Sequence, residues 1–474
     1  MSYRSPNRNR ILKTLATTGA LTFGVVGLTM VSAGASQPVV DEVDRARGVA
    51  ERAAATETAV RTLRLEVASE RAEREGAELA ESLLLAAQGF ETLKFPEVPD
   101  DWVAAGLDPS KGVRNEEGRL VQVLPDGSRV FFTIDPDVQE RLDRMLNDSL
   151  TPHGSVVLID PPTGRVIAKA HNSRRGSEYQ NLARVASPPS ASVFKVVTAA
   201  ALMESAAQDP HEEVCYHGGV RSLTERNITG DARFDNNCNN LEGALARSLN
   251  SLIAKQAYHN LSREDLLDWA ERFGYNQQIP FELPVEISRA TFNDDPFERA
   301  RAAAGFWHTH LSPLHGALIG AALANDGVMM QPTIIDRYEA PDGRVIFEFE
   351  PQVFREVMPA ETAQKLGEMM VTTARSGSAR RHFGQRRAFP NSVEVSGKTG
   401  TLSNQNPFLR FTWFVGFAQH KAWADHPGVA VAGLMANDPE WHMLGPRAAS
   451  EGLRYYFSIE TARRAQQDEA VAAR

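Results

Sequence analysis

The sequence predicts an α+β domain: a five-stranded antiparallel sheet flanked by helices, with a large helical insertion. In residues 155–170, two β-rich runs flank a turn sequence, Asp-Pro-Pro-Thr-Gly, which is typical of a hairpin. Three more strand candidates lie near the end of the chain, at 393–402, 411–418 and 428–435. The stretch between them, 190–385, is mostly helical pattern and loop. Strands at both ends of a domain with helices between them indicate a sheet built by the two ends.

A membrane segment and a helical stalk are expected before this domain. Residues 1–14 form a basic tail, and 15–35 are an uncharged stretch diluted by Thr and Gly. This pattern indicates either an uncleaved anchor or a cleaved signal, since Ala33-Gly34-Ala35 resembles a signal-peptidase box. In both cases the rest of the chain is exported.

The next segment, 36–94, is rich in Ala, Glu and Arg and carries apolar residues at a loose heptad spacing. We expect a helical stalk that packs on the main body, on a partner or on a second copy. A proline-containing stretch marks a linker at 95–112. The main domain is then expected at 113–465, where two short strands and a helix at about 136–150 come before the hairpin, and 466–474 are a tail.

Composition and charge exclude several classes of protein. The chain has 474 residues, 42% of them hydrophobic, and a net charge of −9, which argues against nucleic-acid binding. The only two cysteines, Cys215 and Cys238, have no CxxC partner, which excludes a zinc ribbon. In an oxidising compartment they could form a disulfide, and the alternative is two separate buried thiols. No cofactor and no metal site is predicted.

A serine and a lysine lie three positions apart in SVFK, within an otherwise apolar helical run. On a helix, positions i and i+3 share a face, so Ser192 Oγ and Lys195 Nζ can meet. Burial disfavours the ammonium form, and a neutral lysine can take the proton from a serine hydroxyl. The functional interpretation is an activated serine. The alternative is that Lys195 extends to solvent and Ser192 only caps the helix.

Two further motifs favour the functional interpretation. Ser248-Leu249-Asn250 lies between two helical stretches, and Lys398-Thr399-Gly400-Thr401 lies on a predicted strand. Each motif alone is weak evidence, but SxxK, SxN and KTG in this order are the set found in penicillin-binding proteins and class A β-lactamases.

The sequence over residues 113–460 therefore resembles the transpeptidase domain of penicillin-binding proteins, with the fold of the β-lactamase and transpeptidase superfamily. The resemblance implies that Ser192 is acylated by a peptide ending in D-Ala-D-Ala. Lys195 would be its general base, and Ser248 would pass the proton to the leaving amine. Asn250 would hold both Lys195 and the substrate amide, and Lys398 would supply a second cation.

The resemblance also implies a substrate-binding strand. Thr399 and Thr401 would bind the substrate carboxylate, and the backbone N–H groups of Ser192 and Thr401 would form the oxyanion hole. We expect Gly400 to lack a side chain so that the substrate can lie along the strand. No glutamate follows SxN in the pattern that class A β-lactamases use for deacylation; Glu286 is the nearest by spacing.

The implied activity is a serine D,D-transpeptidase that cross-links peptidoglycan stem peptides and is inhibited by β-lactams. A D,D-carboxypeptidase, a β-lactamase or β-lactam sensor, and a catalytically idle wall-synthesis scaffold remain alternatives. The implied location is the bacterial inner membrane, crossed once by residues 15–35, with the catalytic domain in the periplasm. Because the segment before the domain is too short for a glycosyltransferase, we expect a separate glycan polymerase and other wall-synthesis proteins as partners.

Overall fold

The computed structural model describes residues 98–472 except 175–178, 220–222, 385–388, 407 and 424–425. The predicted basic tail, membrane segment and stalk, residues 1–94, lie outside the described residues. The chain from Phe95 to Arg474 forms one compact unit. None of the helices in the described part of the chain combines the length and apolarity needed to cross a membrane.

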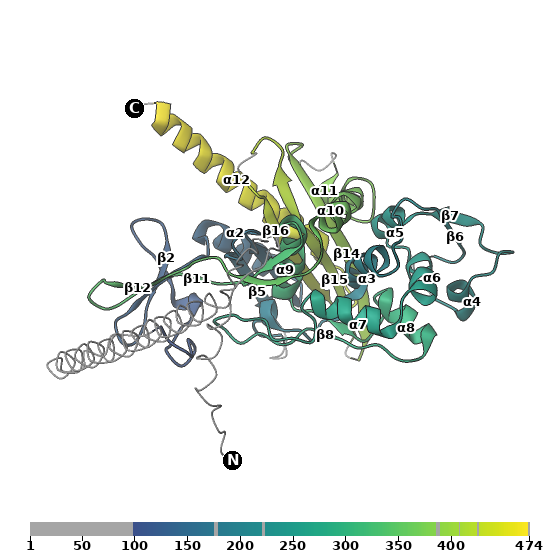
Figure 1. The fold of residues 1–474 in the computed structure, drawn as a ribbon. Helices are drawn as coiled ribbons and strands as arrows, with labels where there is room; N and C mark the ends of the chain where they lie inside the picture. The colour runs from purple at the N-terminus through teal and green to yellow at the C-terminus, as the bar shows by residue number, and fades with distance from the viewer. Residues whose placement is uncertain are drawn as a thin grey trace, which may run out of the picture. The chain divides into compact units, whose positions relative to one another are not determined.

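The predicted five-stranded antiparallel sheet is present, and both ends of the domain build it (Figure 1). Its strands follow the order β14-β15-β16-β4-β5. They are β4 (His153–Ile159), β5 (Val166–Ser173), β14 (Val393–Gln405), β15 (Phe408–His420) and β16 (Val429–Asn437). The β14–β15 ladder runs from Val393 opposite His420 to Gln405 opposite Phe408, so both strands are longer than the sequence predicts.

Helices cover both faces of this sheet, which explains the nearly continuous apolar sequence of its central strands. On one face lie α2 (Pro136–Asp148) and α12 (Gly445–Ala472), and on the other lies α9 (Pro313–Ala324). Every residue of β4 and β16 is buried. In α9, Gly320 allows close approach to the sheet, since a Cβ there would lie 2.3 Å from the carbonyl oxygen of Gly416.

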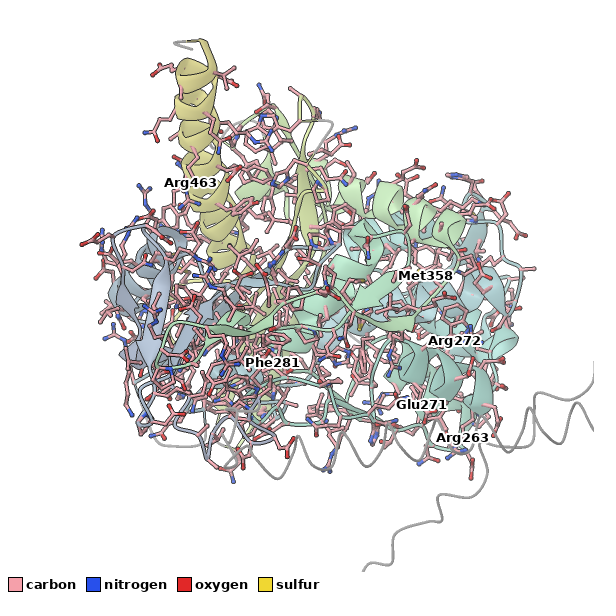
Figure 2. The ribbon with its side chains drawn as sticks, turned by 60° about the vertical axis from the view of Figure 1, so that its left-hand side comes forward. Arg263, Glu271, Arg272, Phe281, Met358 and Arg463 are labelled. Atoms are coloured by element: carbon pink, nitrogen blue, oxygen red, sulfur yellow. A yellow bond between two sulfur atoms is a disulfide. The ribbon has the colours of Figure 1, made fainter. Side chains whose placement is uncertain are left out.

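The helical insertion follows β5 and brings the motif residues together at one end of the sheet. Figure 2 shows α7, with Arg263, Glu271 and Arg272, and α12, with Arg463, on opposite sides of the domain. The helical elements of the insertion and of the segment before β14 are η2 (Leu182–Arg184), η3 (Ala191–Phe194), α3 (Lys195–Glu204), α4 (Glu225–Thr229), α5 (Leu241–Arg247), α6 (Asn250–Asn260), α7 (Arg263–Arg272), α8 (Pro296–Ala303), α10 (Ala360–Arg375) and α11 (Arg380–Phe383).

A second five-stranded sheet adds strands to the stretch 190–385, which is predicted to be mostly helix and loop. Its order is β1-β2-β3-β11-β12. The strands are β1 (Val113–Arg114), β2 (Leu120–Val123), β3 (Arg129–Phe132), β11 (Ile335–Glu339) and β12 (Val345–Glu348). The β3–β11 pair joins residues about 200 positions apart, and local sequence patterns do not predict such a long-range pairing. Short pairs also form from β6 (Val214–Tyr216) with β7 (Asn237–Asn239), β8 (Arg289–Ala290) with β9 (Thr309–His310), and β10 (Val328–Met330) with β13 (Val353–Glu356).

The described part of the predicted linker, 98–112, packs on the domain instead of standing apart from it. Leu107 is buried, and the ring of Trp102 meets that of Tyr338 edge-on at 5.3 Å. The Gln122 side chain donates to the carbonyl of Gly106 at 2.8 Å. The domain therefore begins before residue 113. At its other end, α12 continues through the predicted boundary at 465 to Ala472.

Candidate active site

The predicted nucleophile, Ser192, lies in the 3-10 turn η3 immediately before α3. Trp413 of β15 holds this turn by donating its indole N–H to the carbonyl of Pro189 at 2.9 Å. Ala191 has a positive φ of 49°, which is uncommon for a residue with a side chain. Gly305 packs against it so closely that a Cβ there would lie 2.2 Å from the Ala191 carbonyl oxygen. The turn is therefore fixed from two sides.

Lys195 is fully buried, and three oxygens surround its Nζ. Ser192 Oγ lies at 2.7 Å, Asn250 Oδ1 lies at 2.7 Å, and the carbonyl oxygen of Ala304 is the third. A neutral amine has two N–H donors and one lone pair. If the two carbonyl oxygens accept the N–H groups, the lone pair is left for the hydroxyl of Ser192. This arrangement suits a proton acceptor.

Burial, and then the nearby Lys398, hold the pKa of Lys195 well below its ordinary value. Burial also lowers the pKa of Lys398, to about 7. In the described part of the chain, neither amine forms an ion pair with a carboxylate, and both contact only neutral oxygens.

Ser248 and Asn250 lie at the junction of α5 and α6. Ser248 caps the end of α5 in the left-handed region, with φ 57°, and this turn allows α6 to begin at Asn250. The Nζ of Lys398 donates to Ser248 Oγ at 3.0 Å. The junction thus brings Ser248 to Lys398 and Asn250 to Lys195.

The KTG residues lie on β14, which contacts η3. Lys398 and Gly400 are buried and Thr401 is exposed. Thr399 Oγ1 lies 2.6 Å from Ser378 Oγ. At Gly400 a Cβ would lie 3.2 Å from Val193 and 3.3 Å from the Ser190 carbonyl oxygen, so this glycine allows β14 to approach the nucleophile turn. This packing is a second reason for glycine here, beside the predicted room for a substrate along the strand.

Cys215 and Cys238 form a disulfide that joins β6 to β7. Both cysteines are exposed, so the alternative of separate buried thiols does not describe them. Lys255 of α6 donates to the Cys215 carbonyl at 2.9 Å and pairs with Asp235 at 2.7 Å. The β6–β7 pair is therefore attached to α6, the helix that carries Asn250.

Two groups of the site were missed by sequence reasoning. The Ala304 carbonyl follows α8 in AAAGFW, and it could not be identified from the sequence because every residue type supplies a backbone oxygen. Ser378 follows α10, and its contact with Thr399 gives a hydroxyl pair beside the KTG strand. Its position 20 residues before the KTG motif was the available signal.

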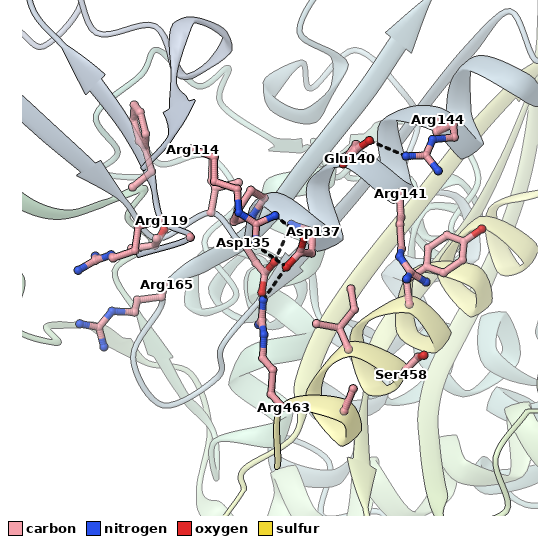
Figure 3. Close-up of a pocket in the computed structure, with 18 of the residues that line it drawn as sticks. Arg114, Arg119, Asp135, Asp137, Glu140, Arg141, Arg144, Arg165, Ser458 and Arg463 are labelled. Carbon is pink, nitrogen blue, oxygen red and sulfur yellow. Dashed lines mark hydrogen bonds and ion pairs between the residues drawn. The ribbon is translucent and has the colours of Figure 1, made fainter. Parts of the chain in front are cut away.

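A cavity of about 1120 Å³ lies elsewhere, between α2, α12 and the second sheet (Figure 3). Several of its charged side chains form ion pairs. Arg114 contacts Asp137 at 2.7 Å, and Arg463 of α12 contacts Asp137 at 3.1 Å and also Asp135, which caps α2. These pairs join α12 to α2, and we assign them a structural role.

The fold, and a site with a serine beside a buried lysine, define a class of protein: a serine-type acyltransferase. The family model described as the penicillin binding protein transpeptidase domain matches residues 154–450. The chain belongs to this family.

Similarities to individual proteins agree with this assignment. The chain is 26% identical over 349 residues to the peptidoglycan D,D-transpeptidase PbpA of Mycolicibacterium smegmatis, covering 66% of this chain and 68% of that protein. It is 27% identical to the penicillin-binding protein PbpB of the same organism, of which it spans 56%. Among solved structures, it resembles penicillin-binding protein 3 of Mycobacterium tuberculosis in complex with aztreonam, with a TM-score of 0.60, 22% identity, and coverage of 77% of this chain and 90% of that one.

Proposed function

We propose that this protein is a serine D,D-transpeptidase that cross-links peptidoglycan stem peptides through an acyl-enzyme on Ser192, and that β-lactams acylate the same serine. The observation that carries the proposal is the environment of Lys195. Its Nζ lies 2.7 Å from Ser192 Oγ, while two carbonyl oxygens occupy its other hydrogen-bonding directions. A buried amine with a lowered pKa can accept the serine proton at neutral pH.

In the proposed acylation step, Ser192 Oγ attacks the carbonyl carbon between the two terminal D-Ala residues and passes its proton to Lys195. The backbone N–H groups of Ser192 and Thr401 stabilise the oxyanion. When the C–N bond breaks, Ser248 relays a proton to the leaving amine of the terminal D-Ala. Asn250 orients Lys195 and the substrate amide.

The carboxylate of the departing D-Ala is proposed to bind at β14. Lys398 contributes positive charge, and Thr399 and Thr401 contribute hydroxyl groups. An amine from a second stem peptide then attacks the acyl-enzyme, which releases Ser192 and forms the cross-link. Attack by water instead of the amine gives the carboxypeptidase reaction.

The position of Glu286 supports slow hydrolysis of the acyl-enzyme, because its carboxylate is engaged in a structural contact. Its carboxylate accepts from the backbone N–H of Ala186 at 2.8 Å, and its own N–H donates to the carbonyl of Arg184 at 3.0 Å. Glu286 therefore holds the segment before the nucleophile turn. This structural contact supports a long-lived acyl-enzyme and disfavours the β-lactamase alternative.

We further propose that residues 15–35 anchor or export the protein, so that the catalytic domain works on the outer side of the cytoplasmic membrane. The substrate chemistry supports this, because cross-linking takes place where the glycan strands are. A separate glycan polymerase is the proposed partner, supplying strands that carry the stem peptides.

The test is covalent labelling with a fluorescent penicillin, followed by mass spectrometry of the labelled peptide. We expect a stable adduct on Ser192 and none on the Ser192→Ala variant. Incubation of the protein with labelled pentapeptide and an amine acceptor then separates cross-linked dimer from free tetrapeptide. If the Ser192→Ala variant is still labelled, Ser192 is not the nucleophile.

A further inference from the structure

A largely buried lysine that catalysis does not use lies at the far edge of the main sheet. Lys169 is on β5, the edge strand opposite to β14. Its backbone N–H donates to the Gln139 side chain at 2.9 Å. In the part of the chain that the structure describes, its Nζ has no carboxylate at ion-pair distance.

The side chain of Lys169 lines a cavity of about 750 Å³ under the N-terminal segment of the domain. His171, two residues further along β5, and Arg184 of η2 line the same cavity, and Leu107 and Leu283 form apolar walls. A second cavity of about 420 Å³ shares four lining residues with the first, which are Pro109, Ser110, Lys169 and His171. The two cavities therefore adjoin.

The charges at the larger cavity are mainly positive. Its only lining carboxylate is that of Asp108, which pairs with Lys111 at 3.6 Å and accepts from the Ser110 hydroxyl at 2.6 Å. The Arg184 guanidinium donates to the carbonyl of Pro284, and Lys169 feels Asp108 and Asp143 without forming an ion pair with either among the described residues. Of the two carboxylates at the adjoining cavity, Asp143 accepts from Gln139 and Glu140 pairs with Arg144.

Burial, and then the positive charge of Arg184, lower the pKa of Lys169 to about 8. Burial also lowers the pKa of His171 to about 4, so this side chain is neutral at physiological pH, and its buried Nδ1 has no hydrogen-bond partner in the described structure. An ammonium and a guanidinium therefore line one cavity with an imidazole whose buried Nδ1 is unsatisfied, and a bound anion would compensate the burial of these groups.

We propose that this cavity is a binding site for a phosphate or carboxylate group, separate from the serine site. Lys169 supplies an ammonium, Arg184 a guanidinium that can bind two oxygens at once, and His171 a ring N–H. The side chains of Leu107 and Leu283 lower the local polarity, which strengthens these charge-assisted hydrogen bonds. Phosphate and carboxylate share this recognition chemistry.

The test is isothermal titration calorimetry of the purified full chain at neutral pH, with inorganic phosphate in one arm and glutarate in the other. We expect millimolar affinity for at least one anion, and the anion that binds identifies the ligand class. Lys169→Gln and Arg184→Gln should each weaken binding about tenfold, while Lys169→Arg retains it. Lys365→Gln, an exposed lysine of α10, is the matched control and should leave binding unchanged.

A second measurement uses the protonation of Lys169 itself. After reductive methylation with ¹³C-formaldehyde, the Lys169 signal should titrate near pH 8 in the free protein. A saturating anion should move that midpoint upward by about one unit, because the charged amine binds it about tenfold better. Circular dichroism confirms that each variant is folded. Absence of binding in both arms, or equal binding by wild type and both Gln variants, would overturn the proposal.

Discussion

Two buried lysines in one site have different roles because different atoms surround each Nζ. Lys195 is enclosed by Ser192 Oγ and two carbonyl oxygens, whereas Lys398 contacts Ser248 Oγ at 3.0 Å and its neighbour's carbonyl at 2.9 Å. The positive charge of Lys398 also lowers the pKa of Lys195. One lysine therefore helps to keep the other neutral, and only the neutral one can accept a proton.

Replacing Lys195 by Arg tests whether this lysine is the proton acceptor. Arginine keeps the positive charge but is not deprotonated in proteins, so the Lys195→Arg variant should lose penicillin acylation by about a thousandfold or more. The acylation rate is measured by stopped-flow or gel fluorescence, with Lys365→Arg on the surface of α10 as the control. Near-normal acylation of Lys195→Arg would show that the lysine is not the proton acceptor.

Replacing Lys398 by Met tests how much folding stability the protein loses by burying this amine. Between its folded pKa of about 7 and its ordinary value near 10.5, the unfolded chain binds a proton that the folded chain does not. Wild-type stability should therefore rise with pH through this window. Lys398→Met removes the buried charge and should stabilise the protein by about 2 kcal/mol at about pH 6, and by less at about pH 9. Urea unfolding at both pH values measures the difference in free energy of unfolding between Lys398→Met and wild type. If this difference is the same at both pH values, the assigned pKa is contradicted.

Sequence reasoning found the side chains of the site but not all of its atoms. Short motifs predict Ser192, Lys195, Ser248, Asn250 and Lys398. The structure joins Lys195 to Ser192 and Asn250, and Lys398 to Ser248, by hydrogen bonds. The Ala304 carbonyl could not be predicted, because any residue type supplies a backbone oxygen. Its position depends on how α8 packs against α3, which is a tertiary property.

At the scale of elements, close packing between η3 and its neighbours fixes the nucleophile. Strand β14 approaches on one side at Gly400, and the segment after α8 approaches on the other at Gly305. Gly305 also has φ +89°, which disfavours any side chain. The segment carries the Ala304 carbonyl, so a shift of Gly305 moves a partner of Lys195 as well.

Gly305→Ala should therefore reduce acylation more than stability. The new Cβ meets the Ala191 carbonyl oxygen at 2.2 Å and displaces the turn, and a misplacement of about 1 Å can cost about a hundredfold in rate. We expect a destabilisation of only about 1–2 kcal/mol from the strained φ. Gly219→Ala is the matched control, since a Cβ there has no atom within 4 Å. Equal acylation rates in the two variants would show that the turn tolerates the displacement.

The two sheets differ in how well the sequence predicts them. The main sheet has long apolar strands that are buried on both faces, so its sequence pattern is strong. In the second sheet, β11 and β12 are short and only partly buried, and they pair with strands from the start of the domain. Their stabilisation comes from long-range partners, which a local pattern does not contain.

At the scale of the whole molecule, ion pairs and packing unite distant parts of the chain into one catalytic unit. Arg463, near the end of α12, contacts Asp135 and Asp137 at the start of α2. The segment 98–112 packs under the second sheet, so the compact unit begins before the predicted boundary at 113. The site residues named above all belong to the unit that begins at Phe95, and the role predicted for residues 1–94 is attachment and recruitment.

That role gives a prediction about the stalk at 36–94. We predict that its Ala-rich apolar stripe is a docking surface, because a solvated spacer would not need one. Deleting residues 41–90, while keeping 15–35 and the catalytic domain, should leave penicillin labelling of Ser192 unchanged, because the site is built entirely from residues after 98. Co-purification with wall-synthesis proteins should fall. A variant with a Gly/Ser linker of equal length in place of 41–90 keeps the reach of the chain but removes the apolar stripe, so it should also lose the partners. If the linker variant retains them, the stalk is only a spacer and the docking hypothesis is wrong.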